Sequence, residues 1–338
     1  MWIFRRRGGG DAGRTGARHG SQGRTPERGR DGARGAADGV PDTSFPFLTT
    51  GQAARLRSLA RQAFAEHGVE VEIGPDHLIG ADGGRYGLQN LFATCHNTPG
   101  GERAWREVVR AHVARIHRIG AEPSPADLTD RDLLARAVVR VCGTSTLPGP
   151  LDDFRYHRHL GGDLVELLVC DSPEAVAYLT DPEVERVGAD ELRAAGVENL
   201  LREDFGRPHR LAGPRGSRFD VLLGDSVFTA SRLLTMDDVL RRVTGDPTAP
   251  HGVLVGVPNR HQLAFHRLAD ATGIGALEGM ARFTAQGFTD GVGAVSPHVF
   301  WRPPGGGELQ QVTRIEAPGE IVLRVEGDFE ATLGGLLG

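Results

Sequence analysis

The chain has 338 residues and a formal net charge of −5; 39% of its residues are hydrophobic and 6% are aromatic. This length is sufficient for two domains with hydrophobic cores. All 39 basic residues are arginine, because the sequence contains no lysine. The absence of lysine excludes sites that need its amine, including the nucleotide-binding P-loop, the protein-kinase site and the pyridoxal-phosphate Schiff base.

Charge and glycine are unevenly distributed along the chain. Residues 1–44 contain nine arginines against five acidic residues, which gives +4 and leaves −9 for the other 294 residues. With eleven glycines and few large apolar side chains, residues 1–44 are predicted to form a disordered tail. An arginine and glycine tail can bind RNA, but acidic residues interrupt this one, which favours a solvated segment. The acidic remainder argues against a large nucleic-acid surface.

Cysteine usage and hydropathy indicate the compartment. Cys95, Cys142 and Cys170 are far apart and form no Cys-x-x-Cys pair, which is typical of free thiols in a reducing compartment. No apolar run is long enough to span a membrane, and the first residues lack the apolar region of a secretion signal. We therefore expect a cytoplasmic protein without a cofactor.

Residues 45–147 are predicted to form an N-terminal α/β sub-domain. Thr49 and Gln52 form a capping-box pattern, and the helix that follows should end at Gly68. Residues 69–73 alternate as a strand, residues 105–119 form a second helix, and the β-branched residues 138–141 are extended. The turn-rich segment 144–150 indicates the boundary to the next sub-domain.

Residues 148–338 are predicted to form a second α/β sub-domain. Its expected strands are residues 164–170, 219–223, 299–301 and 321–325. Its expected helices are residues 173–179, a helical hairpin over 187–201 broken at Gly196, residues 227–234 and residues 269–286. Since strands and helices interleave, the fold class is α/β (α+β), with mixed β-sheets flanked by helices.

A hairpin is expected at the centre of this second sub-domain. Val253 to Val257 is a short apolar run bounded by glycine and by Pro258 and Asn259, as in a strand buried on both faces. Leu263 and Phe265 resume with the period of a strand. The polar residues between the two strands would form the tip of the hairpin.

Five polar residues are the candidate ligand-binding site, namely Asp225, Arg232, Asn259, Arg260 and His261. The strands that precede Asp225 and Pro258 are expected to be neighbours, which would bring these side chains to adjacent ends of one sheet. Polar groups gathered at strand ends are typical of ligand sites in α/β folds, and arginine suits a carboxylate or a phosphate. The structural alternative is an N-cap Asp225 paired with an arginine beside a solvated turn.

A metal site is a weaker candidate. His157 and His159 would lie on the same face of one strand, since side chains alternate there, and His266, His298 or Asp163 could supply a third ligand. Because the chain has 13 histidines and no His-Glu-x-x-His or Cys-x-x-Cys pattern accompanies this pair, we expect no metal.

Several segments between residues 130 and 301 resemble the YtpQ-like family of uncharacterised bacterial proteins. They are Gly162 to Val165, Cys170 to Pro173, Val197 to Leu200, Asp225 to Leu234 and Val253 to Pro258. The chain departs from the family pattern at Phe228, where a tyrosine is usual, and in its N-terminal tail. The resemblance implies a cytoplasmic bacterial α/β protein and carries no established activity.

We therefore expect a non-catalytic binding or regulatory module that recognises a protein partner or a small anionic ligand. The first alternative is an enzyme acting on an anionic substrate around Asp225, Arg232 and residues 259–261. The second is an RNA-associated protein that acts through the tail. The sequence indicates no specific nucleic-acid partner and no membrane span.

Overall fold

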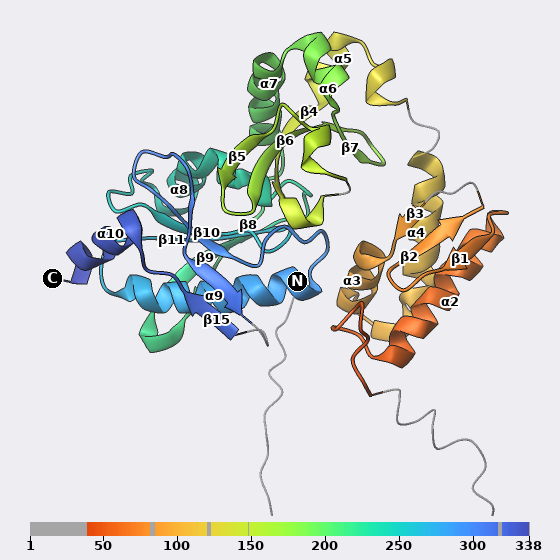
Figure 1. Cartoon of the computed structure of the whole chain (residues 1–338), viewed down its shortest axis with the longest axis horizontal. Coiled ribbons are helices and arrows are strands. Elements are labelled where there is room, and N and C mark those ends of the chain that lie inside the picture. The colour runs from red at the N-terminus through yellow and green to blue at the C-terminus, as the bar shows by residue number, and fades with distance from the viewer. Residues whose placement is uncertain (1–38, 82–84, 120–122, 148, 317–319, 338) are drawn as a thin grey trace, which may run out of the picture.

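The computed structural model describes residues 39–81, 85–119, 123–147, 149–316 and 320–337. The predicted tail therefore lies outside the described residues as far as residue 38. Its last part is placed: the Asp42 carboxylate accepts hydrogen bonds from the amides of Ser44 and Phe45 and forms an ion pair with Arg57. We call residues 39–119 the N-terminal lobe and residues 123–337 the body (Figure 1).

The N-terminal lobe packs three helices and a small antiparallel sheet around its own core. Its elements are α2 (Thr50–Glu66), β1 (Val71–Ile73), β2 (His77–Gly80), β3 (Arg85–Gly87), α3 (Gln89–Asn97) and α4 (Trp105–Ile119). The predicted capping box is confirmed, since Thr49 caps the Gln52 amide and the Gln52 side chain returns to the Thr49 amide. The core contains Phe45, Leu56, Phe92 and Val109 among others, and all its described members lie between residues 45 and 116.

The first part of the body is a four-stranded antiparallel sheet with helices beside it. Its elements are α5 (Asp130–Arg136), β4 (Ala137–Gly143), β5 (Arg158–Gly161), β6 (Leu164–Asp171), β7 (Val176–Tyr178), α6 (Asp181–Val187) and α7 (Ala189–Arg202). Strand β6 is central and pairs with β4, β5 and β7. Helix α7 packs on β4 at Gly196, where an added Cβ would lie 2.9 Å from the Val139 backbone nitrogen.

The second part of the body is a six-stranded sheet in the order β13-β12-β10-β11-β9-β8. Its elements are β8 (Arg207–Ala212), β9 (Arg218–Leu223), α8 (Met236–Thr244), β10 (Val253–Gly256), β11 (Gln262–Arg267), α9 (Thr272–Asp290), β12 (Val299–Arg302) and β13 (Gln310–Gln311). The predicted central hairpin is confirmed, because β10 and β11 pair antiparallel and Val255 faces Phe265 in the register. Strand β8 is an edge strand, and five of its six residues, 207–210 and 212, are exposed.

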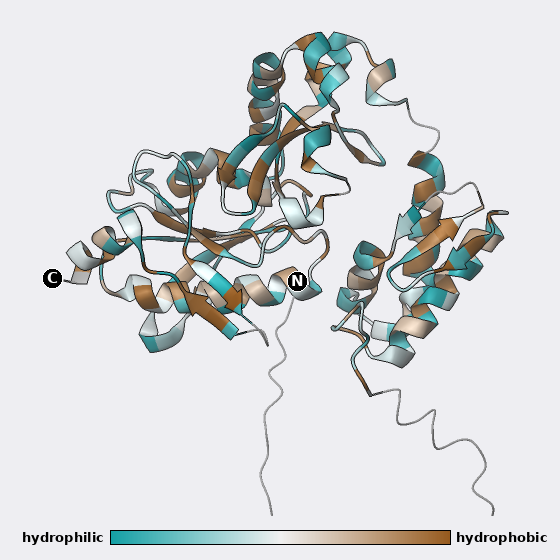
Figure 2. Ribbon diagram, in the orientation of Figure 1, coloured by the Kyte–Doolittle hydropathy of each residue, from teal (hydrophilic) through white to brown (hydrophobic). Residues whose placement is uncertain are grey.

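A two-stranded sheet and a helix form the C-terminal end of the described chain and follow the second sheet. Strands β14 (Thr313–Glu316) and β15 (Glu320–Leu323) form a two-stranded sheet, and α10 (Gly327–Leu337) follows. Phe329 of α10 packs its ring against Trp301 at 5.9 Å between centroids. On the other face of the β12-β10-β11-β9 strands, Val141 and Leu164 of the first sheet share a core with Val255 and Phe300 of the second. Figure 2 shows the hydrophobic colour gathered along the strands of both sheets.

The α+β class is confirmed, but four local predictions differ. In place of the predicted helix over 227–234, the chain forms a 3-10 helix over Ala230–Thr235. The strand pairs among the described residues are antiparallel rather than mixed, because adjacent strands are joined by hairpins or by returning segments. Residues 176–178 form β7 and not a helix, since β6 offers them a ladder. Gly196 does not break a helical hairpin, because α7 continues through it.

The lobe boundary also differs from the one predicted at residue 147. Strand β4 pairs with β6 along its whole length, from Ala137 opposite Cys170 to Gly143 opposite Leu164. The segment before residue 147 therefore belongs to the body, and the described chain is interrupted between the lobes at residues 120–122. In the described part of the chain, no helix combines the length and the apolar character needed to cross a bilayer.

Candidate functional site

The strands that precede Asp225 and Pro258, β9 and β10, are not neighbours as predicted, because β11 lies between them. The tip of the hairpin nevertheless lies against the segment that follows β9, since β11 pairs with β9. The amide of Gly224 donates to the His261 carbonyl at 3.1 Å, and the amide of Ala230 donates to the Arg260 carbonyl at 3.1 Å. Asp225 is exposed, and its charge acts on the His261 ring. Asp225, Arg260 and His261 are therefore neighbours in the structure.

Asn259 has a structural position at this tip. It is buried, its Oδ1 accepts a hydrogen bond from the His261 amide at 3.1 Å, and its Nδ2 donates to the Gly287 carbonyl at 3.0 Å. Both ends of the side-chain amide are therefore engaged by the backbone. Asn259 fixes the turn against the end of α9 and leaves the two residues after it to present side chains.

Arg232 is buried, and its side chain contacts residues 203–205. It is 0% exposed, its Nη2 donates to the Glu203 carbonyl at 2.6 Å, and its guanidinium lies 5.4 Å from the Phe205 ring centroid. Nε and Nη1 have no hydrogen-bond partner among the described residues. Burial lowers the Arg232 pKa. Arg232 thus ties residues 203–205 to the short 3-10 helix Ala230–Thr235.

His261 holds the Arg260 side chain in place. Arg260 Nε donates to His261 Nε2 at 3.0 Å, so Nε2 must carry the lone pair. The proton of the neutral ring then resides on Nδ1, which lies 3.2 Å from the Gly224 carbonyl oxygen and donates to it. Burial and the Arg260 charge lower the His261 pKa, which keeps this neutral form at pH 7. Both ring nitrogens are engaged.

Arg260 is a mostly buried cation in a positively charged environment. Its aliphatic stem passes over Gly293, where φ is +72° and an added Cβ would lie 2.5 Å from the Arg260 Cδ. Burial, and after it the positive charges of Arg140 and Arg115, lower its pKa to about 10. No carboxylate in the described part of the chain lies within ion-pair distance of Arg260.

Arg140 enters the same region from the first sheet. It lies in β4, and its guanidinium stands over the Tyr178 ring at 5.5 Å from the centroid. The Tyr178 hydroxyl accepts a contact from the Cys142 thiol at 3.8 Å. Burial raises the pKa of Tyr178 to about 12 and also raises the pKa of Cys142. Neither side chain therefore supplies a negative charge to Arg140 at pH 7.

The N-terminal lobe contributes Arg115 and His112 from α4. Arg115 Nε donates to the Glu174 carbonyl at 2.7 Å, and the Glu174 carboxylate forms its ion pair with Arg118 at 2.7 Å. His112 is mostly buried, and its pKa is lowered by burial and by the charges of Arg115 and Arg260. The His112 ring is therefore neutral at pH 7 and adds no charge of its own.

We call Arg115, Arg140 and Arg260 the arginine cluster. If Glu174 and Arg118 are counted as a neutral pair, the cluster retains three positive charges, because the tyrosine, cysteine and histidine side chains around it are neutral. Two of its Nε atoms are engaged by the protein, while its terminal nitrogens have no hydrogen-bond partner among the described residues. Arg260 and Arg140 are partly buried, whereas Arg115 is exposed to solvent. A partly buried cation that lacks a carboxylate partner favours a counter-ion.

The predicted histidine pair is not brought together as a metal site. His159 lies in β5 and its Nε2 contacts the Gly162 carbonyl, whereas His157 precedes the strand and its Nδ1 contacts the Phe154 carbonyl. The two residues therefore do not share a strand face. A search of the described ranges finds no group of three metal-ligating side chains.

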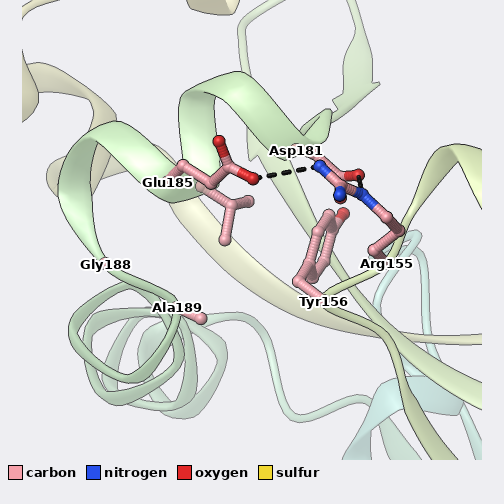
Figure 3. A pocket seen from close by; sticks show the side chains of 7 residues that line it. Arg155, Tyr156, Asp181, Glu185, Gly188 and Ala189 are labelled. Carbon is pink, nitrogen blue, oxygen red and sulfur yellow. Dashed lines mark hydrogen bonds and ion pairs between the residues drawn. The ribbon is translucent and has the colours of Figure 1, made fainter.

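A shallow hollow beside α6 and α7 is a second concave feature, shown in Figure 3. Its volume is about 380 Å³, and its lining includes Tyr156, Val184 and Ala189. Arg155 forms ion pairs there with Asp181 at 2.5 Å and with Glu185 at 3.0 Å (Figure 3). The Tyr156 hydroxyl donates to the Leu179 carbonyl at 2.6 Å. The polar groups of this hollow thus satisfy one another.

Comparison with family models, with curated proteins and with solved structures finds no match to this chain. The resemblance to the YtpQ-like family therefore stays a prediction, and the function has to be argued from the geometry.

Sequence reasoning found Arg260 and His261 but missed the rest of the arginine cluster. One signal was present in the sequence, because Arg140 interrupts the apolar, β-branched run of residues 138–141. Burying a charged side chain there costs free energy unless the charge has a partner. Arg115 carries no comparable signal, because an arginine on an amphipathic helix is ordinary.

Proposed function

We propose that the protein is a non-catalytic module that binds a small anionic ligand at the arginine cluster. The observation that carries the proposal is Arg260, a mostly buried guanidinium that has no carboxylate within ion-pair distance in the described part of the chain and on which the positive charges of Arg140 and Arg115 act. Guanidinium groups bind carboxylate and phosphate oxygens through paired N–H donors. An anion would remove the mutual repulsion of the cluster.

Binding is favoured over catalysis by the state of His261. A general base needs a free ring nitrogen, but Nδ1 contacts the Gly224 carbonyl and Nε2 accepts from Arg260. The same ring orients Arg260 so that its terminal nitrogens stay available. This arrangement supports a site that holds a ligand and does not transform it.

A small ligand is also favoured over a protein partner. Among the described residues only five large hydrophobic side chains are exposed, and they are spread along the sequence from Val40 to Val325. Isolated apolar residues of this kind are normal on a protein surface, whereas a partner surface usually shows a contiguous patch.

We further propose that the protein works in a reducing compartment, the bacterial cytoplasm that the family resemblance implies. Cys95, Cys142 and Cys170 are buried and are present as free thiols. Burial raises the pKa of Cys95 to about 12, so that its unreactive thiol form dominates.

The test is a thermal-shift titration with sulfate, phosphate and citrate at constant ionic strength. We expect these anions to raise the melting temperature of the parent protein, and Arg260→Gln to abolish the rise. Arg106→Gln is the matched control, because Arg106 is exposed on α4, where it donates to Gln62 at 3.4 Å and its charge acts on Glu66. Equal shifts in the parent and in Arg260→Gln would contradict the proposal.

A further inference from the structure

The N-terminal lobe and the body do not share a hydrophobic core. Within the described ranges, the core of the lobe contains only lobe residues, and the hydrophobic clusters of the body contain only body residues. An interface without a common apolar core resembles the interface between proteins that associate transiently. The docking of the lobe on the body therefore depends on the polar contacts between them.

The ionic contact between the lobe and the body is made at Glu174, in the turn between β6 and β7. Its carboxylate accepts hydrogen bonds from Arg118 Nε at 2.7 Å and from Arg118 Nη2 at 3.2 Å. Its backbone carbonyl accepts from Arg115 Nε at 2.7 Å. Arg118 keeps the pKa of the Glu174 carboxyl below its usual value, so this group is charged at pH 7. Two arginines one turn apart on α4 thus hold one residue of the body, and we call this contact the latch.

A second set of contacts joins α3 to the end of α9 and the residues after it (Figure 1). Asn97 Nδ2 donates to the Asp290 carbonyl at 2.7 Å, and the Gly293 amide donates to Asn90 Oδ1 at 2.9 Å. Gly293 also contacts the hairpin tip, because its carbonyl accepts from the Arg260 amide at 2.8 Å and the Arg260 stem passes over it. The lobe is therefore docked beside the tip that carries Arg260.

We infer that the N-terminal lobe is a reversible cover of the hairpin tip, and that the latch at Glu174 holds it on the body. While the lobe is docked, it restricts the access of an anion to Arg260, which is partly buried in this state. Release of the lobe opens that access. The role of the cover rests on the proposed function, whereas the latch itself does not.

The Gly293 amide is a reporter of docking, because its partner Asn90 belongs to the lobe. The experiment measures hydrogen exchange of this amide in the full chain by nuclear magnetic resonance, with an amide of the central strand β10 as the reference for global unfolding. Faster exchange at Gly293 with an unchanged reference means that the lobe has left the body. Raising the salt concentration from about 0.1 M to about 1 M shortens the screening length from about 10 Å to about 3 Å, so we expect faster exchange at Gly293 in the parent.

Glu174→Gln tests the latch, because it removes the charge but keeps the backbone carbonyl that Arg115 contacts. We expect exchange at Gly293 to be faster than in the parent by about two- to fivefold, the effect of losing one exposed ion pair. Glu66→Gln is the matched control. Glu66 accepts from Nε and Nη2 of Arg110, on the same helix α4, at 2.8 and 2.7 Å, but this ion pair lies within the lobe. It should leave exchange at Gly293 unchanged.

Sulfate binding, measured by calorimetry at constant ionic strength, tests the cover. Glu174→Gln should bind sulfate more tightly than Glu66→Gln, and by the same factor as the exchange, since the apparent affinity scales with the fraction of open protein. Exchange at Gly293 that is equal in Glu174→Gln and the parent overturns the latch. Faster exchange with unchanged or weaker sulfate binding overturns the cover and leaves the proposed function intact. The absence of sulfate binding in all three proteins overturns the proposed function, and with it the cover, but not the latch.

Discussion

Replacing Gly196 with alanine should destabilise the body, although alanine is the better helix former. Gly196 lies inside α7, where an alanine at an unconstrained position would stabilise the helix by about 1 kcal/mol. At this position an added Cβ would lie 2.9 Å from the Val139 backbone nitrogen and 3.2 Å from both the Val138 carbonyl carbon and Val139 Cγ1. The first two atoms are backbone atoms of β4 and cannot turn away.

The contact should outweigh the propensity. Strand β4 is held on one side by β6 and on the other by the Ser231 hydroxyl, which accepts from the Val141 amide at 3.1 Å. Forcing a methyl group into such a packed contact costs roughly 1–3 kcal/mol. We therefore expect the free energy of unfolding of Gly196→Ala to be lower than that of the parent by up to about 2 kcal/mol after the helical gain of about 1 kcal/mol is subtracted.

Urea unfolding followed by far-ultraviolet circular dichroism would measure this difference. The matched control is Gly334→Ala, because Gly334 lies in α10 and an added Cβ meets nothing within 4 Å. That variant should equal or exceed the parent in stability. A Gly196→Ala protein that gains as much stability as Gly334→Ala would refute the reasoning, and an equal loss in both variants would show that the contact with β4 is not its cause.

Three other predictions concern buried polar groups. Asp163→Asn should stabilise the protein at pH 7. Burial raises the pKa of Asp163, so ionising this carboxyl costs stability above that pKa, while the asparagine Oδ1 still accepts the hydrogen bond from the Ser296 hydroxyl. The gain in the urea midpoint should vanish below pH 3.8. Burial lowers the pKa of His266 from 6.5, so the parent should become less stable as the pH falls below 6.5. His266→Gln should reduce the difference between the urea midpoints measured at pH 7.5 and pH 5.5, and an unchanged difference would contradict this prediction. Asn199→Ala should lower the free energy of unfolding by about 1–3 kcal/mol, because the amide donates to the Leu134 and Ala137 carbonyls; an unchanged urea midpoint would argue against it.

Locally encoded elements of this fold could be predicted from the sequence. The capping box at Thr49 and the amphipathic spacing after it identify α2, and the apolar run before Pro258 identifies the β10 and β11 hairpin. These features are specified by residues close together in the chain, where turn chemistry and periodicity act.

Elements fixed by distant partners could not be predicted. The residues of β7 become a strand because β6 pairs with them, and β8 was missed because the sequence Arg207 to Ala212 is polar and contains a proline. The arginine cluster shows the same limit, since Arg115, Arg140 and Arg260 come from three separate elements. A single sequence gives the position of each charge but not the tertiary contacts that bring them together.

The exposed edge strand β8 bears on how copies of this chain meet at high concentration. An open edge offers unpaired backbone groups to any other strand, and a long, flat, apolar edge would act as a template for aggregation. Here Pro208 supplies no amide hydrogen. If β8 of a second copy paired antiparallel with this strand, Arg207 and Arg210 would face arginines of that copy, and the like charges would repel. Replacing Pro208 and both arginines with valine and threonine would turn an edge strand that resists pairing with another chain into one that favours it.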